Sequence, residues 1–353
     1  MKMIGGFFPL EYKLSQDNFF DSVCHENWDL QFTMSGRCAI YHALNDLKKT
    51  DTRRVAYLPA YTCETVVAPY KKAGYQLYFY DVSRDMTPVF DERMLDRISV
   101  LSLCGYYGFC NYDRIFVKTC RSLGIAVIED VTHSVFSADG MDGSCNYIVG
   151  SLRKWFGIAG GGFAIKTTGR FDSPLLPSHS THLLLRDVSM SLKADALRNG
   201  SKELMAMADQ AFWDAEMMLR DEFDAFESET ASSNLMIRFD YRDLAHKRRQ
   251  NYQYLLDMVR TDRSFTIVFP ELKEGIVPSH FTIYHPDRDR IKQQLQQESI
   301  QATVYWPVNG DVDLTRYPQA AYIYDHVLSL PCDQRYGKTA MKRIAAALNR
   351  IGK

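Results

Sequence analysis

The sequence predicts an α/β protein in which a mostly parallel central sheet is flanked by helices and followed by a smaller C-terminal α+β domain. Three observations predict this fold class. Short apolar runs alternate with helix-like segments between residues 30 and 166. Because these runs are short and continuous, they are typical of strands that are covered on both faces. After residue 170 the alternation gives way to long, charged segments with helical spacing.

The α/β part is predicted to begin with a helix that follows the apolar run at residues 30–33. Ser35 is a suitable N-cap, because its hydroxyl can accept a hydrogen bond from a free backbone N–H group. Helical spacing then puts apolar side chains on one face, at Ala39, Ile40, Ala43, Leu44 and Leu47.

Further apolar runs predict the strands of the sheet. They lie at residues 55–58, 77–80, 100–103, 125–128, 147–149 and 163–165. Helix-like spacers at residues 63–72 and 113–122 separate some of these runs. Since parallel neighbours need a crossover connection, usually a helix, these spacers favour a largely parallel sheet.

The second half is predicted to be a loop rich in Ser, Pro and His after residue 170, and then a set of helices and strands. Helices are expected at residues 196–226, 240–260, 287–298 and 337–350, and strands at residues 281–284, 302–305 and 327–330. A length of 353 residues predicts about two domains. We expect a large α/β domain at residues 1–230 and a small α+β domain at residues 231–353.

The charge and cysteine content exclude several classes of function. The 42 Lys and Arg residues balance 43 Asp and Glu residues, which argues against a nucleic-acid or acidic-membrane partner. No apolar run is long enough to span a membrane, and residues 1–11 lack the apolar core of a signal peptide, so a cytoplasmic protein is expected. The eight cysteines form no CxxC pair, which favours reduced thiols and predicts no metal site.

Polar residues that follow the apolar runs are the candidates for chemistry, because ligands of open α/β sheets lie beyond the carboxyl ends of the strands. Ser35, Gly36 and Arg37 open a helix whose free N–H groups suit a phosphate, although a plain helix cap is the commoner reading of such a turn. Asp130 lies just after the run at residues 125–128, where a carboxylate can reach a ligand or simply cap the next helix.

Lys154 follows another run and precedes Gly160, Gly161 and Gly162. Taken alone it reads as a solvated side chain on a turn. Taken in order, a phosphate-accepting turn, a carboxylate and a lysine are the parts that hold pyridoxal 5'-phosphate. The lysine amine captures the aldehyde and moves protons, for which its pKa must be low, and the carboxylate keeps the ring nitrogen protonated.

The same segments resemble the DegT/DnrJ/StrS-type aminotransferases, a family of fold type I pyridoxal-phosphate enzymes. The resemblance rests on four segments, at residues 35–44 (SGRCAIYHAL), 58–63 (LPAYTC), 128–134 (IEDVTHS) and 151–162 (SLRKWFGIAGGG), and extends from about residue 5 to about residue 348. It implies a homodimeric aminotransferase with sites at the subunit interface, which often acts on nucleotide-linked keto sugars with glutamate as amino donor.

The resemblance also implies roles for individual residues. Lys154 matches the Schiff-base lysine and Asp130 the partner of the pyridine nitrogen. Gly36 and Arg37 match the backbone turn that binds the phosphate, and Ser151 matches a hydroxyl on the same phosphate. His133 stands where the family usually has a Gln near the ring hydroxyl, and is expected to add a group that titrates near neutral pH.

Two further positions depart from the family pattern, Cys63 and Gly160, and Gly160 stands where an acidic residue commonly precedes the glycine pair. Cys63 stands where the family usually places an aromatic ring that stacks on the cofactor, so the expected substitutes are Tyr61, Tyr106 and Tyr107, or no stacking ring at all. The asparagine that the partner subunit supplies has only Asn234 as a candidate. These departures put the usual sugar substrate in doubt more than the cofactor.

A substrate pocket is expected to draw on further polar and aromatic residues, because an arginine can grip a carboxylate or diphosphate with two hydrogen bonds. The candidates are Arg153, Arg186, Arg238, His280 and Trp306. Each of them also has an ordinary reading as an exposed charge or a core ring. The Met-rich stretch at residues 204–219 predicts helix packing, for which a dimer surface is one candidate.

Three functions remain open from the sequence. The first is the aminotransferase. The second is a lyase or aldolase that acts on an amino acid with the same cofactor. The third is a cofactor-binding regulatory protein without turnover, against which the presence of both Lys154 and Asp130 argues, because a silent scaffold needs neither. No GxGxxG occurs, and Cys332 replaces the first glycine of a would-be phosphate loop that ends at Lys338 and Thr339, so both nucleotide motifs are excluded.

Overall fold

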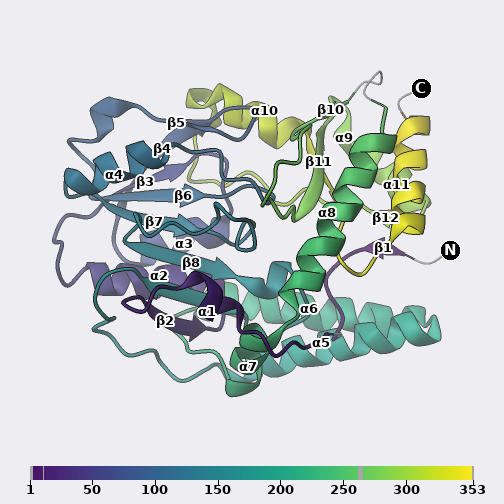
Figure 1. Ribbon diagram of the computed structural model, residues 1–353, viewed down its shortest axis with the longest axis horizontal. Coiled ribbons are helices and arrows are strands. Elements are labelled where there is room, and N and C mark those ends of the chain that lie inside the picture. Colours follow the sequence, from purple (N-terminus) through teal and green to yellow (C-terminus); the bar gives the residue numbers. More distant parts are fainter. Residues whose placement is uncertain (1–2, 11, 261–264, 352–353) are drawn as a thin grey trace.

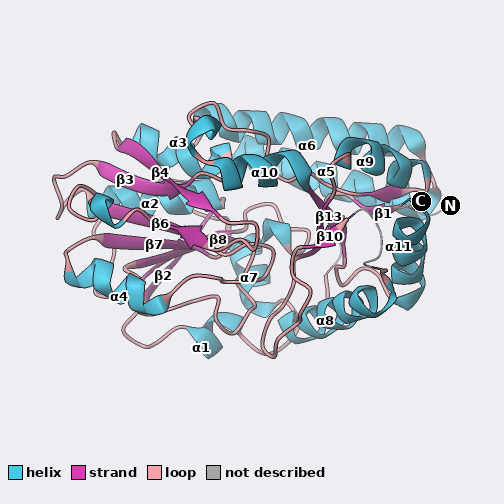
Figure 2. Ribbon diagram, turned by 90° about the horizontal axis from the view of Figure 1, so that it is seen from above, coloured by secondary structure: helices cyan, strands magenta, loops and turns pink. Residues whose placement is uncertain are grey.

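The architecture is that of a computed structural model, which describes residues 3–10, 12–260 and 265–351. A large sheet occupies one side of the molecule and a smaller sheet the other (Figure 1). Two long antiparallel helices, α5 (Ser180–Asn199) and α6 (Lys202–Glu222), run past both parts (Figure 2). The predicted α/β class with a central sheet flanked by helices is confirmed.

The large sheet has the strand order β2-β9-β8-β7-β6-β3-β4-β5. Its strands are β2 (Asp29–Thr33), β3 (Val55–Pro59), β4 (Gln76–Val82), β5 (Pro88–Val89), β6 (Val100–Cys104), β7 (Ala126–Asp130), β8 (Tyr147–Ser151) and β9 (Gly162–Lys166). The five central strands from β8 to β4 are joined by parallel pairing, whereas β2, β9 and β5 pair antiparallel. All six predicted runs are strands.

Helices cover both faces of this sheet. Ala56 and Leu58 of β3 pack in one apolar cluster with helices α2 (Gly36–Leu47) and α3 (Glu64–Lys72). Tyr57, between them, faces the opposite cluster, to which α4 (Arg114–Ser122) and α1 (Phe19–Val23) contribute. Successive strand residues point to opposite faces, so continuous apolar runs are what a sheet buried on both sides requires.

The helical region differs from the prediction. Residues 180–195 belong to α5 rather than to a loop, and the predicted helix at residues 196–226 is the end of α5 followed by α6. The chain breaks at Gly200, whose φ of 69° suits glycine, and Ser201 caps α6. The predicted helix at residues 240–260 is confirmed as α8 (Tyr241–Met258), and α7 (Thr230–Arg238) precedes it.

The small sheet is antiparallel, with the order β10-β11-β13. Its strands are β10 (Thr266–Ile267), β11 (His280–Tyr284) and β13 (Val327–Pro331), and the helices around it are α9 (Arg288–Gln297), α10 (Pro318–His326) and α11 (Lys338–Ile351). The predicted strand at residues 302–305 is wrong, because only Thr303 forms a bridge, to Ser329. The division at residues 230 and 231 stays a prediction.

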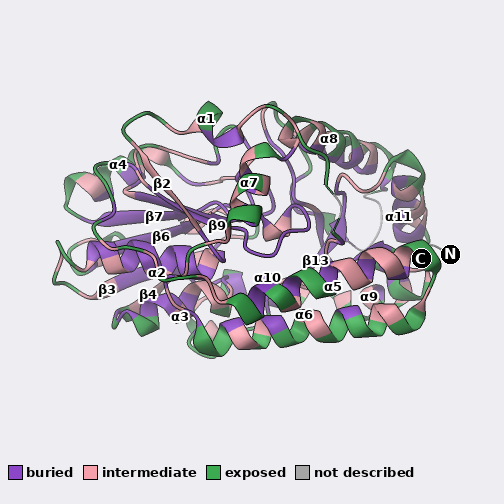
Figure 3. Cartoon of the chain, turned by 90° about the horizontal axis from the view of Figure 1, so that it is seen from below, coloured by how far each residue is buried: buried purple, intermediate pink, exposed green. Residues whose placement is uncertain are grey.

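The N-terminal segment lies beside the C-terminal part of the chain. Strand β1 (Ile4–Gly5) pairs in parallel with β12 (Ile300–Gln301). Figure 3 shows buried strands between the helices, and shows α5 and α6 with one side buried and the other exposed. Within the described ranges no helix is both long enough and apolar enough to cross a membrane.

Candidate functional site

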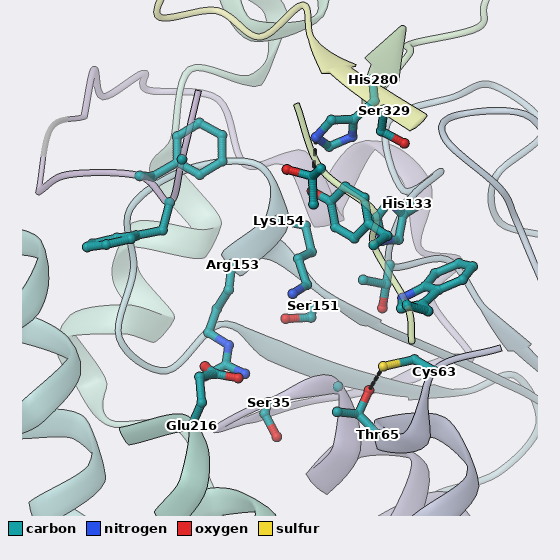
Figure 4. A pocket seen from close by; sticks show the side chains of 18 of the residues that line it. Ser35, Cys63, Thr65, His133, Ser151, Arg153, Lys154, Glu216, His280 and Ser329 are labelled. Atoms are coloured by element: carbon teal, nitrogen blue, oxygen red, sulfur yellow. Dashed lines mark hydrogen bonds and ion pairs between the residues drawn. The ribbon is translucent and has the colours of Figure 1, made fainter. Parts of the chain in front are cut away.

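A pocket of about 710 Å³ lies between the two sheets, beyond the carboxyl ends of β6, β7 and β8. Seven residues for which the sequence predicts a cofactor role line it: Gly36, Arg37, Cys63, Asp130, His133, Ser151 and Lys154. The small sheet supplies the opposite wall, where His280 and Ser329 lie (Figure 4). Segments more than 200 residues apart in the sequence therefore meet at one cavity.

Lys154 ends a short 3₁₀ turn, Leu152–Lys154, that follows β8. In Figure 4 its side chain crosses the pocket and its amine is directed at Ser151. Burial lowers the pKa of Lys154, an effect that the carboxylate of Glu216 opposes and the guanidinium of Arg153 reinforces. A buried amine with a lowered pKa is a better nucleophile near neutral pH than an exposed lysine.

Asp130 is the last residue of β7, with 7% of its surface exposed. Its Oδ1 atom accepts a hydrogen bond of 2.9 Å from the Thr132 N–H group. Burial raises the pKa of Asp130, while this hydrogen bond and the charge of Lys154 oppose the rise. Its neighbour Glu129 points the other way and pairs with Arg114 at 2.6 Å, so one acid of the two faces the pocket, as strand geometry predicts.

The start of α2 forms the floor of the pocket. The Ser35 hydroxyl caps this helix by accepting a hydrogen bond of 3.2 Å from the Cys38 N–H group. A Cβ atom on Gly36 would stand 3.3 Å from Cβ of Ser151 and 3.5 Å from Oγ1 of Thr132, so glycine keeps the helix start open at this point. The Ser151 hydroxyl is buried and has no hydrogen-bond partner among the described residues.

This floor has the properties of an anion seat. A helix N-terminus offers free N–H groups and the positive end of the helix dipole. A buried hydroxyl without a partner costs free energy unless a ligand or a water binds it. The Arg37 side chain is not available there, because its Nη1 donates to the carbonyl of Leu219 and its Nη2 pairs with Glu64 at 3.1 Å.

The expected aromatic substitutes for Cys63 do not reach the pocket. Tyr61 and Tyr107 bond to each other through their hydroxyls at 2.7 Å, and Tyr106 donates to the carbonyl of Tyr61, all outside the described residues that line the cavity. Of the two alternatives that the sequence left open, a stacking tyrosine and no stacking ring from this set, the pocket lining favours the second. The cavity is instead lined by Cys63 and by several aromatic rings, among them those of Tyr305 and Trp306.

His133 also lines the pocket, and its Nδ1 atom lies 3.2 Å from the Ser279 hydroxyl. Burial, together with the charges of Lys154 and Arg248, lowers the pKa of His133 to about 3. The expected titration near neutral pH is therefore wrong. His133 is a neutral ring at pH 7, which can donate at one nitrogen and accept at the other.

Two arginines meet one glutamate at the side of the pocket formed by α5 and α6. Arg186 Nη1 lies 3.0 Å and Arg153 Nη1 lies 3.5 Å from the same oxygen, Oε1 of Glu216. Arg186 is 5% exposed, and its buried Nε has no hydrogen-bond partner in the described part of the chain. The cluster thus keeps one positive charge in excess and has donor capacity that Glu216 does not use.

Of the other residues that were predicted to form a substrate pocket, four line the cavity and one does not. His280 and Trp306 line the cavity together with Arg153 and Arg186. Arg238 does not, because it is exposed on α7, where it contacts Gln16 at 3.4 Å, and that prediction is wrong. Sequence reasoning missed Glu216, Ser279 and Tyr305, since an acid on a charged helix and hydroxyls within the C-terminal part carry no motif.

No protein-family model matches the sequence, and no curated protein matches it either. Solved structures match over almost the whole chain. PseC of Helicobacter pylori, an aminotransferase involved in the biosynthesis of pseudoaminic acid, matches with a TM-score of 0.66 and 14% identity, over 99% of both chains. The putative sugar aminotransferase Spr1654 of Streptococcus pneumoniae, in its PLP form, matches with 0.63 and 13%, over 99% of this chain and 93% of that one.

A DegT DnrJ EryC1 StrS aminotransferase from Brucella abortus matches with a TM-score of 0.56 and 16% identity, over 92% of this chain and 86% of that one. At such low identities the likeness establishes the fold. The chain has the fold of these aminotransferases, and the fold implied by the sequence resemblance is confirmed.

Proposed function

We propose that the protein is a pyridoxal-phosphate-dependent aminotransferase. The observation that carries the proposal is that a half-buried lysine, a buried aspartate and an anion seat at a helix N-terminus line one pocket in the fold of such enzymes. The residues fit the cofactor. The partnerless Ser151 hydroxyl and the open start of α2 at Gly36 suit its phosphate, and Asp130 suits a protonated ring nitrogen.

In this proposal Lys154 binds the cofactor, Asp130 faces the ring nitrogen, and Ser151 with the backbone of Gly36 and Arg37 holds the phosphate. The bound cofactor supplies an aldehyde and an electron-withdrawing ring. The Lys154 amine, whose pKa is lowered by burial, takes a proton from the substrate carbon and returns it. The carboxylate of Asp130 would keep the ring nitrogen of the cofactor protonated.

The N-terminal segment helps to close this pocket against water. Phe7 and Phe8 line it, and Arg335 fixes both residues. Nη1 of Arg335 donates to the Phe7 carbonyl at 3.2 Å, and its guanidinium lies 4.1 Å from the centre of the Phe8 ring. Excluding water protects a reactive substrate carbon and strengthens the electrostatic interactions inside the site.

The amino donor is proposed to be a dicarboxylic amino acid such as glutamate. The excess positive charge at Arg153 and Arg186 supports this choice, because an arginine binds a carboxylate with two parallel hydrogen bonds. The acceptor is proposed to be a keto compound of the nucleotide-linked keto sugar type, by analogy with the sugar aminotransferases of the same fold. We also propose a homodimer, in which Asn234, exposed on α7, reaches the partner's site.

Incubation of the pure protein with pyridoxal phosphate and glutamate tests this function. We expect the visible absorption of the bound cofactor to disappear while one equivalent of 2-oxoglutarate forms for each site. Release of another product with the absorption retained would favour the lyase or aldolase alternative. Binding of the cofactor without any conversion, over a panel of amino acids, would favour the regulatory alternative.

Loss of the Ser151 hydroxyl should weaken the binding of the cofactor. A hydrogen bond to a charged group contributes about 1.5–3 kcal/mol, so Ser151→Ala should raise the dissociation constant of pyridoxal phosphate about 10-fold or more. Ser134→Ala is the matched control, because Ser134 also has a buried hydroxyl without a partner but does not line the pocket. Equal affinities of the two variants, measured by equilibrium dialysis, would contradict the phosphate seat.

Loss of Arg186 should act on the amino donor. We expect Arg186→Leu to raise the KM for glutamate about 10- to 100-fold, the effect of a lost charged hydrogen bond, and to leave the affinity for pyridoxal phosphate within about 3-fold. Arg238→Leu removes an exposed arginine outside the pocket and serves as the control. If Arg186→Leu weakens cofactor binding instead of donor binding, the cluster belongs to the phosphate seat and the donor assignment is wrong.

A further inference from the structure

Four polar side chains form an unbroken chain along the wall of the pocket. His133 Nδ1 lies 3.2 Å from Oγ of Ser279, and the same Oγ lies 3.1 Å from Nδ1 of His280. His280 Nε2 lies 2.9 Å from the hydroxyl of Tyr305. The chain joins the loop after β7 to β11 and to the segment before Trp306, so it links both walls of the cavity.

The hydroxyl of Ser279 makes this chain directional. It stands between two ring nitrogens and can donate its one proton to only one of them. The other nitrogen must therefore carry a proton and donate to the serine oxygen. Since a neutral histidine has one N–H group, His133 and His280 must hold opposite tautomers whenever both contacts are made.

Only two arrangements satisfy all three hydrogen bonds. In the first, Tyr305 donates to His280 Nε2, His280 Nδ1 donates to Ser279, and Ser279 donates to His133, whose proton is then on Nε2. In the second, every donor and acceptor is exchanged. His133 Nδ1 donates, His280 Nε2 donates to the Tyr305 oxygen, and the Tyr305 proton is free to point elsewhere.

The surroundings keep every member of the chain neutral. Arg248 is buried, and its Nη1 donates to the carbonyl of Ser279 at 2.8 Å, so a fixed positive charge lies beside the chain. Burial and this charge lower the pKa of both histidines, and burial raises the pKa of Tyr305. A neutral chain can exchange its two arrangements without separating charge in a buried site.

Both ends of the chain lie at the cavity, because His133 and Tyr305 line it. Of the two His133 ring nitrogens, Nδ1 is used by Ser279, which leaves Nε2 for a ligand. In Figure 4, His133 and His280 flank the pocket on the side of Lys154 that is opposite to Arg153 and Glu216. The chain is thus separate from the arginine cluster.

We propose that His133, Ser279, His280 and Tyr305 form a relay, in which the partner that His133 meets in the pocket decides whether the Tyr305 hydroxyl donates or accepts a hydrogen bond. An oxygen that accepts from His133 Nε2 selects the first arrangement, and a hydroxyl that donates to it selects the second. The relay depends on the function proposed above in one respect: the partner that His133 meets is taken to be the ring oxygen of the cofactor. Ser279 and His280 are positioning residues for the two ends.

The relay is tested by ¹⁵N NMR of protein labelled at histidine, with and without bound pyridoxal phosphate at pH 7.5. The signals are assigned with His133→Gln and His280→Gln variants. We expect opposite tautomers at residues 133 and 280 in both states, and a simultaneous change of both rings if the cofactor changes either. The same tautomer on both rings, in either state, would overturn the relay.

Variants of Ser279 separate coupling from packing. In Ser279→Ala we expect the His280 tautomer to become independent of the cofactor, and in Ser279→Thr, which keeps a hydroxyl, we expect the coupling to return. Thr282→Val is the control, since Thr282 lies on β11, the strand that begins directly after Ser279, with a buried hydroxyl that has no partner among the described residues. If His280 still follows the cofactor in Ser279→Ala, the coupling does not pass through the serine and the proposal is wrong.

Failure of the relay and failure of the proposed function are distinguishable. A protein that binds no pyridoxal phosphate, as judged by dialysis and absorption, contradicts the function, while opposite tautomers in that protein would still support the four-residue chain. A protein that binds the cofactor and transaminates, but has equal tautomers at both histidines, contradicts the relay alone.

Discussion

Replacement of Lys154 by alanine is expected to abolish transamination, with a loss of more than about 10⁴-fold, the upper end of what one acid–base group contributes. The loss is this large because the same amine is proposed to bind the cofactor and to move the proton. The visible absorption that depends on attachment to the amine should also be absent. Both effects follow from the burial of Lys154 at the centre of the pocket.

Lys193→Met is the matched control for this variant. Lys193 is also a buried lysine, and burial lowers its pKa to about 7, but it does not belong to the described lining of the pocket. A reactive amine alone would therefore make both lysines targets of the cofactor. We expect attachment to survive in Lys193→Met and to be lost in Lys154→Ala. The reverse result would show that the cofactor is attached to Lys193 and not to Lys154.

The pH dependence of attachment follows from the same burial. Only the unprotonated amine can attack an aldehyde, and burial lowers the pKa of Lys154 below its usual value of 10.5. The rate of attachment should therefore rise with pH and reach its plateau at a lower pH than it does for an exposed lysine. Stopped-flow absorbance measures this rate, and a rise that continues to the pKa of a free lysine would contradict a buried, desolvated amine.

Replacement of Asp130 by asparagine is expected to lower transamination by about 10²–10³-fold, the usual cost of removing one preorganised electrostatic group. The carboxylate favours the protonated ring nitrogen, and the neutral amide does not. Attachment of the cofactor to Lys154 should persist, since the amine is untouched. The two half-reactions, followed separately in single-turnover experiments, should both be slowed.

Glu129→Gln is the comparison that isolates the position of the charge. Glu129 is the neighbouring acid, but it faces away from the pocket and pairs with Arg114. Its replacement should lower the free energy of unfolding, because it leaves a buried arginine contact incomplete, and should affect the chemical step far less. Equal losses of the single-turnover rate in both variants, at matched stability, would remove Asp130 from the proposed role.

The α/β half was predictable because each strand there is a separate apolar run. The sheet is buried on both faces, so its sequence carries no alternation that could be confused with an exposed strand. Ser35 likewise predicts the start of α2, since a hydroxyl residue just before a helical pattern is a local signal for an N-cap. The pocket residues of this half follow from the same local rules, because each stands at the end of a predicted strand.

Helix α5 was not predictable, because its buried face is partly polar. His182, Arg186, Ser189 and Lys193 recur at helical spacing on that face, where an amphipathic helix normally has apolar residues. Some of these polar groups have tertiary partners, such as the Ala215 carbonyl, which accepts from His182 at 2.9 Å. A pattern based on apolar periodicity therefore reads the segment as a loop.

The remaining errors have the same origin in long-range contacts. Tyr61 and Tyr107 were expected candidates for stacking on the cofactor, but they bond to each other and are core residues. Only the fold brings their two segments together. Residues 302–305 have the composition of a strand, but only Thr303 forms a bridge to β13, and Tyr305 is used at the pocket instead. Sequence patterns report local preference, and these positions are decided by distant partners.

The site of covalent attachment tests the central claim most directly. Pyridoxal phosphate is added to the protein, the linkage is fixed by borohydride reduction, and the modified peptide is identified by mass spectrometry. The account predicts a single modified residue, Lys154, in stoichiometric amount. Modification at Lys193, at Lys292, which also lines the pocket, or over several lysines without preference would contradict it.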